Sequence, residues 1–191
     1  MVAGTVVFLI GLAGAECVPV VAWALQAKPV SQEPQAFDDF TQRVKDYLKL
    51  HKTVESSLPR LKTTKHGKTI IDRQHALAQK IAEARSNSKQ GDIFTPEISE
   101  QFRRVIRAKF HEAGAPNMRK TIRQGEPLTN VQLIVNGAYA ENLPLTTVPP
   151  TLLINLPQLP REVAYRIVDH DLALLDTEAR IVIDFIPGAI P

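Results

Sequence analysis

The chain has 191 residues, of which 44% are hydrophobic and 23% charged, a composition typical of one globular domain with a short appended segment. Its single cysteine, Cys17, excludes an intrachain disulfide and a cysteine-based zinc site. Aromatic residues make up 6% of the chain, too few for a base-stacking surface, so we expect no nucleic acid partner.

The first 27 residues are mostly apolar or small and carry one charged side chain, Glu16. A hydrophobic stretch followed by small residues is typical of a secretory signal peptide, and we predict cleavage after Ala27, with Ala24 and Ala15 as alternatives. A charge near the middle of the segment disfavours the other interpretation, an uncleaved membrane anchor. The mature chain is therefore expected in the periplasm or outside the cell, without a transmembrane span.

Residues 28–36 are mostly polar and contain prolines, which predicts a linker. From Phe37 onward, apolar residues recur at alternating intervals of three and four, and Pro59 and the following KTTKHGK stretch end or kink the helix. This spacing predicts a helix with a narrow heptad seam, which packs against another helix of the chain or mediates self-association into a homo-oligomer. The seam consists of Phe37, Phe40, Val44, Tyr47, His51, Val54, Leu58 and Leu61.

Two further amphipathic helices are predicted over residues 69–88 and 95–114. Thr95 is a good N-cap residue, Pro96 suits the first helical position, and Gly114 is a stop signal. Together the three helices predict an antiparallel helical bundle or hairpin over residues 37–115. The apolar faces are Ile70, Gln74, Leu77, Ile81 and Ala84 in the second helix, and Ile98, Phe102, Val105, Ile106 and Phe110 in the third.

The pattern of residues 116–191 is that of extended chain. Val131–Val135 predicts a strand, and five prolines between residues 143 and 160 predict an extended segment that crosses an apolar surface. Three short β-like runs then predict a small antiparallel meander. We therefore expect an α+β fold in which this Pro-rich and β region packs on the helices as one domain. The three runs are Ala164–Val168, Leu172–Leu175 and Arg180–Ile186.

The two halves of the chain carry opposite net charge. Residues 38–125 hold 19 basic and 10 acidic side chains, a net charge of +9, whereas residues 126–191 hold 3 and 8, a net charge of −5. Basic helices can bind an anionic polymer or a lipid surface, but we favour the interpretation that they are a solvated helix face. The candidate binding residues are Arg103, Arg104, Arg107 and Lys109.

Carboxylates and an imidazole come together in sequence at Asp169, His170 and Asp171, and these groups suit a divalent metal. The simpler interpretation is a turn between two strands, in which aspartate binds its own backbone. His51 lies on the apolar seam, and we expect a buried histidine that is satisfied by a neighbour rather than a ligand.

Motifs of nucleophilic catalysis and of nucleotide binding do not occur: there is no G-x-S-x-G, no P-loop and no G-x-G-x-x-G. The sequence therefore predicts no catalytic residue and no cofactor. In the C-terminal region we expect a structural ion pair between Arg166 and either Asp176 or Asp184.

The C-terminal 40 residues or so carry paired Leu-Pro dipeptides followed by β-like runs that end in IVIDFIP. This segment resembles the C-terminal region of an uncharacterised family of exported bacterial proteins, a resemblance that implies export and no catalytic residue. The matching residues are Leu156-Pro157, Leu159-Pro160, Tyr165–Val168, Leu172–Asp176 and Ile181–Pro187.

Export and the missing catalytic motifs together predict a non-enzymatic protein of the cell envelope that acts by binding. The expected partner is an envelope protein or an anionic polymer. Two alternatives remain: a metal-dependent hydrolase using the acidic and histidine residues near Asp169–Asp171, and binding of an anionic polymer or lipid surface by the basic helices.

Overall fold

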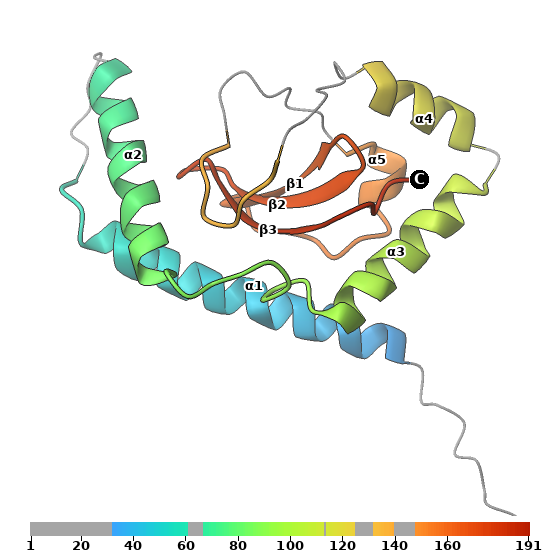
Figure 1. Cartoon of the computed structure of the whole chain (residues 1–191), viewed down its shortest axis with the longest axis horizontal. Helices are drawn as coiled ribbons and strands as arrows, with labels where there is room; N and C mark the ends of the chain where they lie inside the picture. Colours follow the sequence, from blue (N-terminus) through green and yellow to red (C-terminus); the bar gives the residue numbers. More distant parts are fainter. Residues whose placement is uncertain (1–31, 61–66, 113, 125–131, 140–147) are drawn as a thin grey trace, which may run out of the picture. The chain divides into compact units, whose positions relative to one another are not determined.

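The structure is a computed structural model that describes residues 32–60, 67–112, 114–124, 132–139 and 148–191. Within these ranges the chain forms five helices and one three-stranded antiparallel sheet (Figure 1). The predicted α+β class with a small β-meander is therefore confirmed. The predicted signal peptide lies outside the described residues. No helix in the described ranges combines the length and the apolar character that crossing a membrane requires.

Helix α1 covers Gln32–Ser56, so the end of the predicted linker over residues 28–36 is helical. Pro34 tolerates this early start, because N–H groups in the first helical turn have no partner within the helix. Most of the seam faces the interior of the chain, so it packs within the chain, and self-association through it stays a prediction. Its buried residues are Phe40, Val44, Tyr47, His51 and Leu58; Leu61 lies outside the described ranges.

Helix α2 covers Gly67–Ala84, α3 covers Pro96–Phe110, and α4 covers Ala115–Gln124. In α2, Leu77 and Ile81 are buried, but Ile70 is 52% exposed, so one end of the predicted apolar face lies in solvent. Helix α1 contacts both α2 and α3. The predicted bundle is not confirmed, because the buried side chains of these helices join a core that they share with the sheet.

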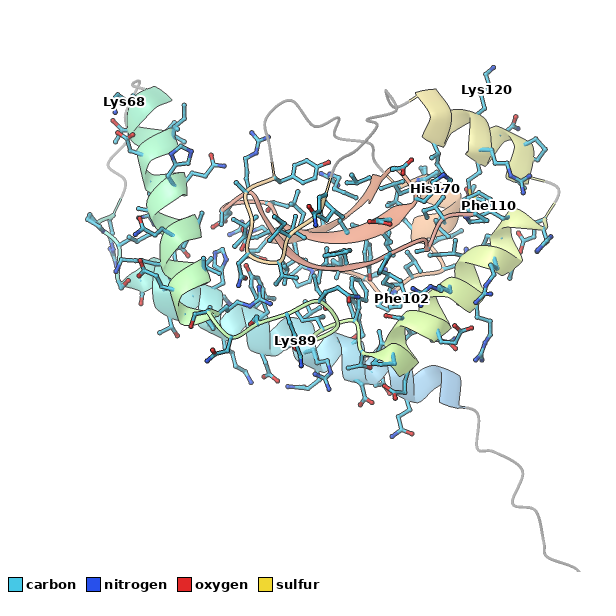
Figure 2. All side chains as sticks on the ribbon, in the orientation of Figure 1. Lys68, Lys89, Phe102, Phe110, Lys120 and His170 are labelled. Atoms are coloured by element: carbon cyan, nitrogen blue, oxygen red, sulfur yellow. The ribbon has the colours of Figure 1, made fainter. Side chains whose placement is uncertain are left out.

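Helix α3 begins as its sequence predicts. The side chain of Thr95 accepts a hydrogen bond from the N–H of Ile98 at 3.4 Å, and Pro96 occupies the first turn. The ring of Phe102, labelled in Figure 2, contacts four other aromatic rings: that of Phe37 in α1, at a centroid distance of 5.3 Å, and one further ring each from α1, the loop before α3 and the sheet. Its centroid lies 5.0 Å from that of Phe40, 5.2 Å from Phe94 and 6.0 Å from Tyr165. This aromatic cluster joins the helices to the sheet.

The sheet consists of β1 (Val163–Val168), β2 (Asp171–Asp176) and β3 (Ile181–Ile186), in that order (Figure 1). Both pairings are antiparallel, which confirms the predicted meander. Side chains on one face join the core formed with the helices. Side chains on the other face form a smaller apolar cluster with Leu133 and Tyr139 of the segment over residues 132–139. The strand residues of this cluster are Val168, Ala173, Leu175 and Val182.

The two edges of the sheet differ. The edge of β3 is covered by residues 136–139, where the N–H of Asn136 donates to Val182 and the N–H of Val182 donates to Gly137. The strand predicted over Val131–Val135 is not formed at residues 132–135, because the chain turns at Asn136, whose φ is +61°. On the other side, β1 pairs with β2 and with no further strand of the described ranges.

The described part of the Pro-rich segment is not wholly extended. Residues Pro150–Leu153 form a short helix, α5, contrary to the prediction. Pro150 favours this helix because its fixed φ suits the first helical position, where no N–H is needed. Leu152 is fully buried, whereas Leu153 and Ile154 are 40% and 82% exposed. The segment thus anchors one leucine in the core and leaves its two apolar neighbours at the surface.

Candidate binding groove and buried polar network

Asp169 and His170 form the turn from β1 to β2, and Asp171 begins β2, so the turn of the simpler interpretation is present. His170 is exposed, and its Nδ1 lies 2.9 Å from the carbonyl oxygen of Ile190 (Figure 2 labels His170). Asp171 accepts a hydrogen bond from the N–H of Gly188. Among the described residues, these three side chains gather no further metal-ligating group.

The predicted basic residues lie along α3 and interact with other groups of the chain. Arg103 donates to the carbonyl of Pro187, Arg107 pairs with Glu100 at 2.8 Å, and Lys109 pairs with Glu112 at 2.6 Å. Arg104 is exposed. This pairing within the chain fits a solvated helix face.

A groove of about 530 Å³ lies along β1. Four consecutive residues, Val163 to Arg166, line it. Because alternate side chains of a strand point to opposite faces, a run of consecutive residues places the groove along the strand edge. The opposite wall is mostly apolar and comes from the segment around α5: Val148, Leu153, Ile154, Leu156, Pro157 and Leu159.

The backbone of β1 also contributes to this groove. The carbonyl of Glu162 accepts from the N–H of Thr177, so the backbone groups of alternate residues from Glu162 onward face β2. The backbone groups of Tyr165 therefore face the open edge. There the Nη1 of Arg166 donates to the carbonyl of Tyr165 at 2.8 Å, which brings the guanidinium to the groove.

Among the described residues that line this groove, Arg166 carries the charge, and Gln158 and Tyr165 are the other polar side chains. The Nε atom of Arg166 is buried and has no hydrogen-bond partner among the described residues. The predicted ion pair of Arg166 with Asp176 or Asp184 is wrong, because both carboxylates are buried and bind other groups. A buried donor without an acceptor costs about 1–3 kcal/mol, and a ligand that accepts from it removes this cost.

Asp184 instead holds the loop before α3. Its two carboxylate oxygens accept hydrogen bonds of 2.8–3.0 Å from four backbone N–H groups. Four backbone donors satisfy this fully buried carboxylate, and the buried guanidinium of Arg85 lies close enough to interact with it electrostatically. The donors are Gly91, Ile93, Phe94 and Phe185.

A second buried carboxylate, Asp176 at the end of β2, holds α1. Its Oδ2 accepts from the hydroxyl of Tyr47 at 2.5 Å and from Nδ1 of His51 at 2.7 Å. Its Oδ1 accepts from the N–H groups of Glu178 and Ala179. The prediction that His51 is a buried histidine satisfied by a neighbour is therefore confirmed.

His51 and Asp176 each stabilise the charged form of the other. The hydrogen bond to Asp176 raises the pKa of His51 above its usual value. Burial alone would raise the pKa of Asp176, but hydrogen bonds from His51 and Tyr47 hold that pKa below its usual value. The pair therefore favours the imidazolium and the carboxylate.

The sequence analysis missed Arg85, which is buried after the end of α2. Its guanidinium donates to the side-chain oxygen of Asn136 at 2.7 Å and to the carbonyl of Ile183 at 3.0 Å, and it lies 5.1 Å from the ring centre of Tyr47. Burial lowers its pKa from a very high usual value. A lone arginine at a helix end carries no pattern that distinguishes it from a surface residue.

Comparisons of the chain with protein-family models, with curated proteins and with solved structures find no match.

Proposed function

We propose that this chain is an exported, non-enzymatic binding protein of the cell envelope, and that its ligand is an amphiphile with an apolar body and an anionic head, such as a long-chain fatty acid. The observation that carries the proposal is the buried Nε of Arg166, which has no acceptor among the described residues and lies at the wall of an apolar groove. Export is supported by the apolar sequence of residues 1–27.

The apolar wall supports an acyl chain as the body of the ligand. The groove volume of about 530 Å³ lies within the range of about 300–1,000 Å³ that is usual for small-molecule sites. Ile154, which lines the groove, is 82% exposed. Covering its surface gains about 25 cal/mol for each Å² of apolar area removed from water.

The guanidinium supports a carboxylate as the head of the ligand. A carboxylate forms short, charge-assisted hydrogen bonds with arginine, which are stronger than those of a neutral acceptor. It would also satisfy the Nε donor that the described residues leave without a partner. An apolar ligand without an acceptor would shield the guanidinium from water and offer no hydrogen bond in return, which is unfavourable. An anionic head is therefore favoured over a neutral one.

The proposal is tested by displacing a fluorescent fatty acid from the purified full chain with unlabelled palmitate. We expect saturable binding of one equivalent to the wild type. Arg166→Gln should weaken it about tenfold or more, because a charge-assisted hydrogen bond is lost. Ile154→Glu should also weaken it, because a charge then lies on the apolar wall. Both positions retain partial or full exposure, so the variants are expected to fold.

Two matched variants serve as controls. Arg161→Gln removes an exposed arginine that pairs with Glu162, and Ile70→Glu places the same charge on an exposed isoleucine of α2. Both should bind like the wild type. Absence of saturable palmitate binding, or equal losses in the test and control variants, would overturn the proposal. If palmitate and the corresponding alcohol bind with equal affinity, the part of the proposal that requires an anionic head is wrong.

A further inference from the structure

We infer that His51, Glu55 and Glu178 form a binding site for a divalent transition-metal ion. One ligand atom of each residue lies within 4.8 Å of the other two, and no other such group of three occurs among the described residues. The site joins α1, which carries His51 and Glu55 one turn apart, to the turn after β2, which carries Glu178. It uses none of the groove residues and stands independently of the proposed function.

The imidazole of His51 is already fixed in the orientation that a metal ligand needs. Nδ1 donates to Asp176 at 2.7 Å, so Nε2 is the nitrogen left for a metal. Histidine ligands are commonly oriented in this way, because a carboxylate on one ring nitrogen fixes the ring and raises the basicity of the other. Asp176 is itself held by Tyr47 and by two backbone N–H groups, so the ring has little freedom to turn away.

The two glutamates complete a cluster of one buried and two partly exposed side chains. His51 is 1% exposed, whereas the side chains of Glu55 and Glu178 are 42% and 43% exposed, so an ion has a path from solvent. Nε2 of His51 lies 3.3 Å from the carboxylate of Glu178. Glu55 also contacts Arg73 through one oxygen at 3.3 Å, and its second oxygen remains for a metal.

The distances between the ligand atoms are close to those around a tetrahedral metal ion for one pair, and the third ligand has to move closer. Ligands at about 2.1 Å from a tetrahedral metal lie about 3.4 Å from one another. The pair of His51 and Glu178 already has this spacing, at 3.3 Å. Glu55 needs a change of side-chain rotamer, which its partial exposure permits.

The donor set indicates the class of metal. One imidazole nitrogen and two carboxylates suit zinc and similar divalent ions, and three protein ligands leave a position for water. Binding would exchange the proton on Nε2 for the ion while the hydrogen bond from Nδ1 to Asp176 stays in place. The ion would then tie α1 to the turn after β2.

The test measures zinc binding to the chelator-treated full chain by competition with a chromophoric chelator. The wild type should bind one equivalent, and zinc should raise its melting temperature. Glu55→Gln and Glu178→Gln should each weaken binding at least tenfold, because each removes a ligand charge. Both residues are partly exposed, and circular dichroism verifies that the variants keep their fold. Cobalt absorption spectra provide a second readout, which should change in both variants.

Two controls separate this site from other zinc-binding groups. Glu100→Gln removes a glutamate that pairs with Arg107 on α3, and it should bind zinc like the wild type. His170→Gln removes the histidine of the β1–β2 turn and should also leave binding unchanged. Absence of binding, or unchanged affinity in the double variant of Glu55 and Glu178, would overturn the inference. A loss of zinc binding in His170→Gln alone would also overturn the inference, and it would place the metal at Asp169–Asp171 instead.

Discussion

Tyr47 donates a hydrogen bond of 2.5 Å to the carboxylate of Asp176, a residue 129 positions further along the chain. His51 binds the same oxygen from the next turn of α1. The carboxylate has no exposed surface, so these donors and two backbone N–H groups replace water around its charge. This contact fixes α1 against the end of β2 and orients His51 toward Glu55 and Glu178.

The variant Asp176→Asn should destabilise the fold strongly. The amide that replaces Oδ2 cannot accept from both Tyr47 and His51, and a buried imidazolium would lose its counterion. We expect the free energy of unfolding in urea to fall by about 3 kcal/mol. Asp72→Asn, which removes an exposed carboxylate that pairs with Lys68 on α2, should leave it unchanged. Equal stability of the two variants would contradict the assignment of Asp176.

The variant Asp184→Asn should loosen the loop before α3. An amide keeps one acceptor oxygen, so two of the four backbone N–H groups bound by Asp184 lose their partner. We expect a loss of about 2 kcal/mol in the free energy of unfolding. Hydrogen exchange should become faster at the amides of Ile93 and Phe94, and protection equal to the wild type would refute the role of this carboxylate.

The conservative change Arg85→Lys should also destabilise the chain. A lysine provides one ammonium in place of a planar fork and cannot reach both Asn136 and the carbonyl of Ile183. We expect thermal unfolding to show a loss of about 2 kcal/mol. Arg161→Lys, at an exposed arginine, is the matched control and should melt with the wild type. If Arg85→Lys melts at the same temperature as Arg161→Lys, the planar guanidinium of Arg85 is not needed for stability.

Stability should fall at alkaline pH because all three tyrosines of the chain have raised pKa values. Burial is the main cause for Tyr47, Tyr139 and Tyr165. A raised pKa means that the folded state favours the neutral phenol, so this stability is present below the usual pKa of 10.0 and is lost as the pH rises above it. Phenolate absorbance should therefore rise together with the loss of ellipticity. A phenolate signal near pH 10 in the folded chain would contradict this prediction.

Local patterns predicted the elements whose structure depends on local rules. The three β-like runs became β1 to β3, and Thr95 and Pro96 begin α3, because alternation and N-capping act within a few residues. The heptad spacing identified the buried face of α1, including His51. The spacing predicted burial less well in α2, where Ile70 belongs to the predicted apolar face but is exposed.

Tertiary structure decided which partners the polar residues take. Periodicity shows that His51 is buried, but its partner Asp176 is 125 positions away, and nothing local marks one acidic residue of a strand as the acceptor. The same reason accounts for the wrong pairing of Arg166, whose guanidinium turns to the open edge of β1. Burial follows from the pattern of one segment, whereas a groove or a ligand set requires segments that are distant in the chain to meet.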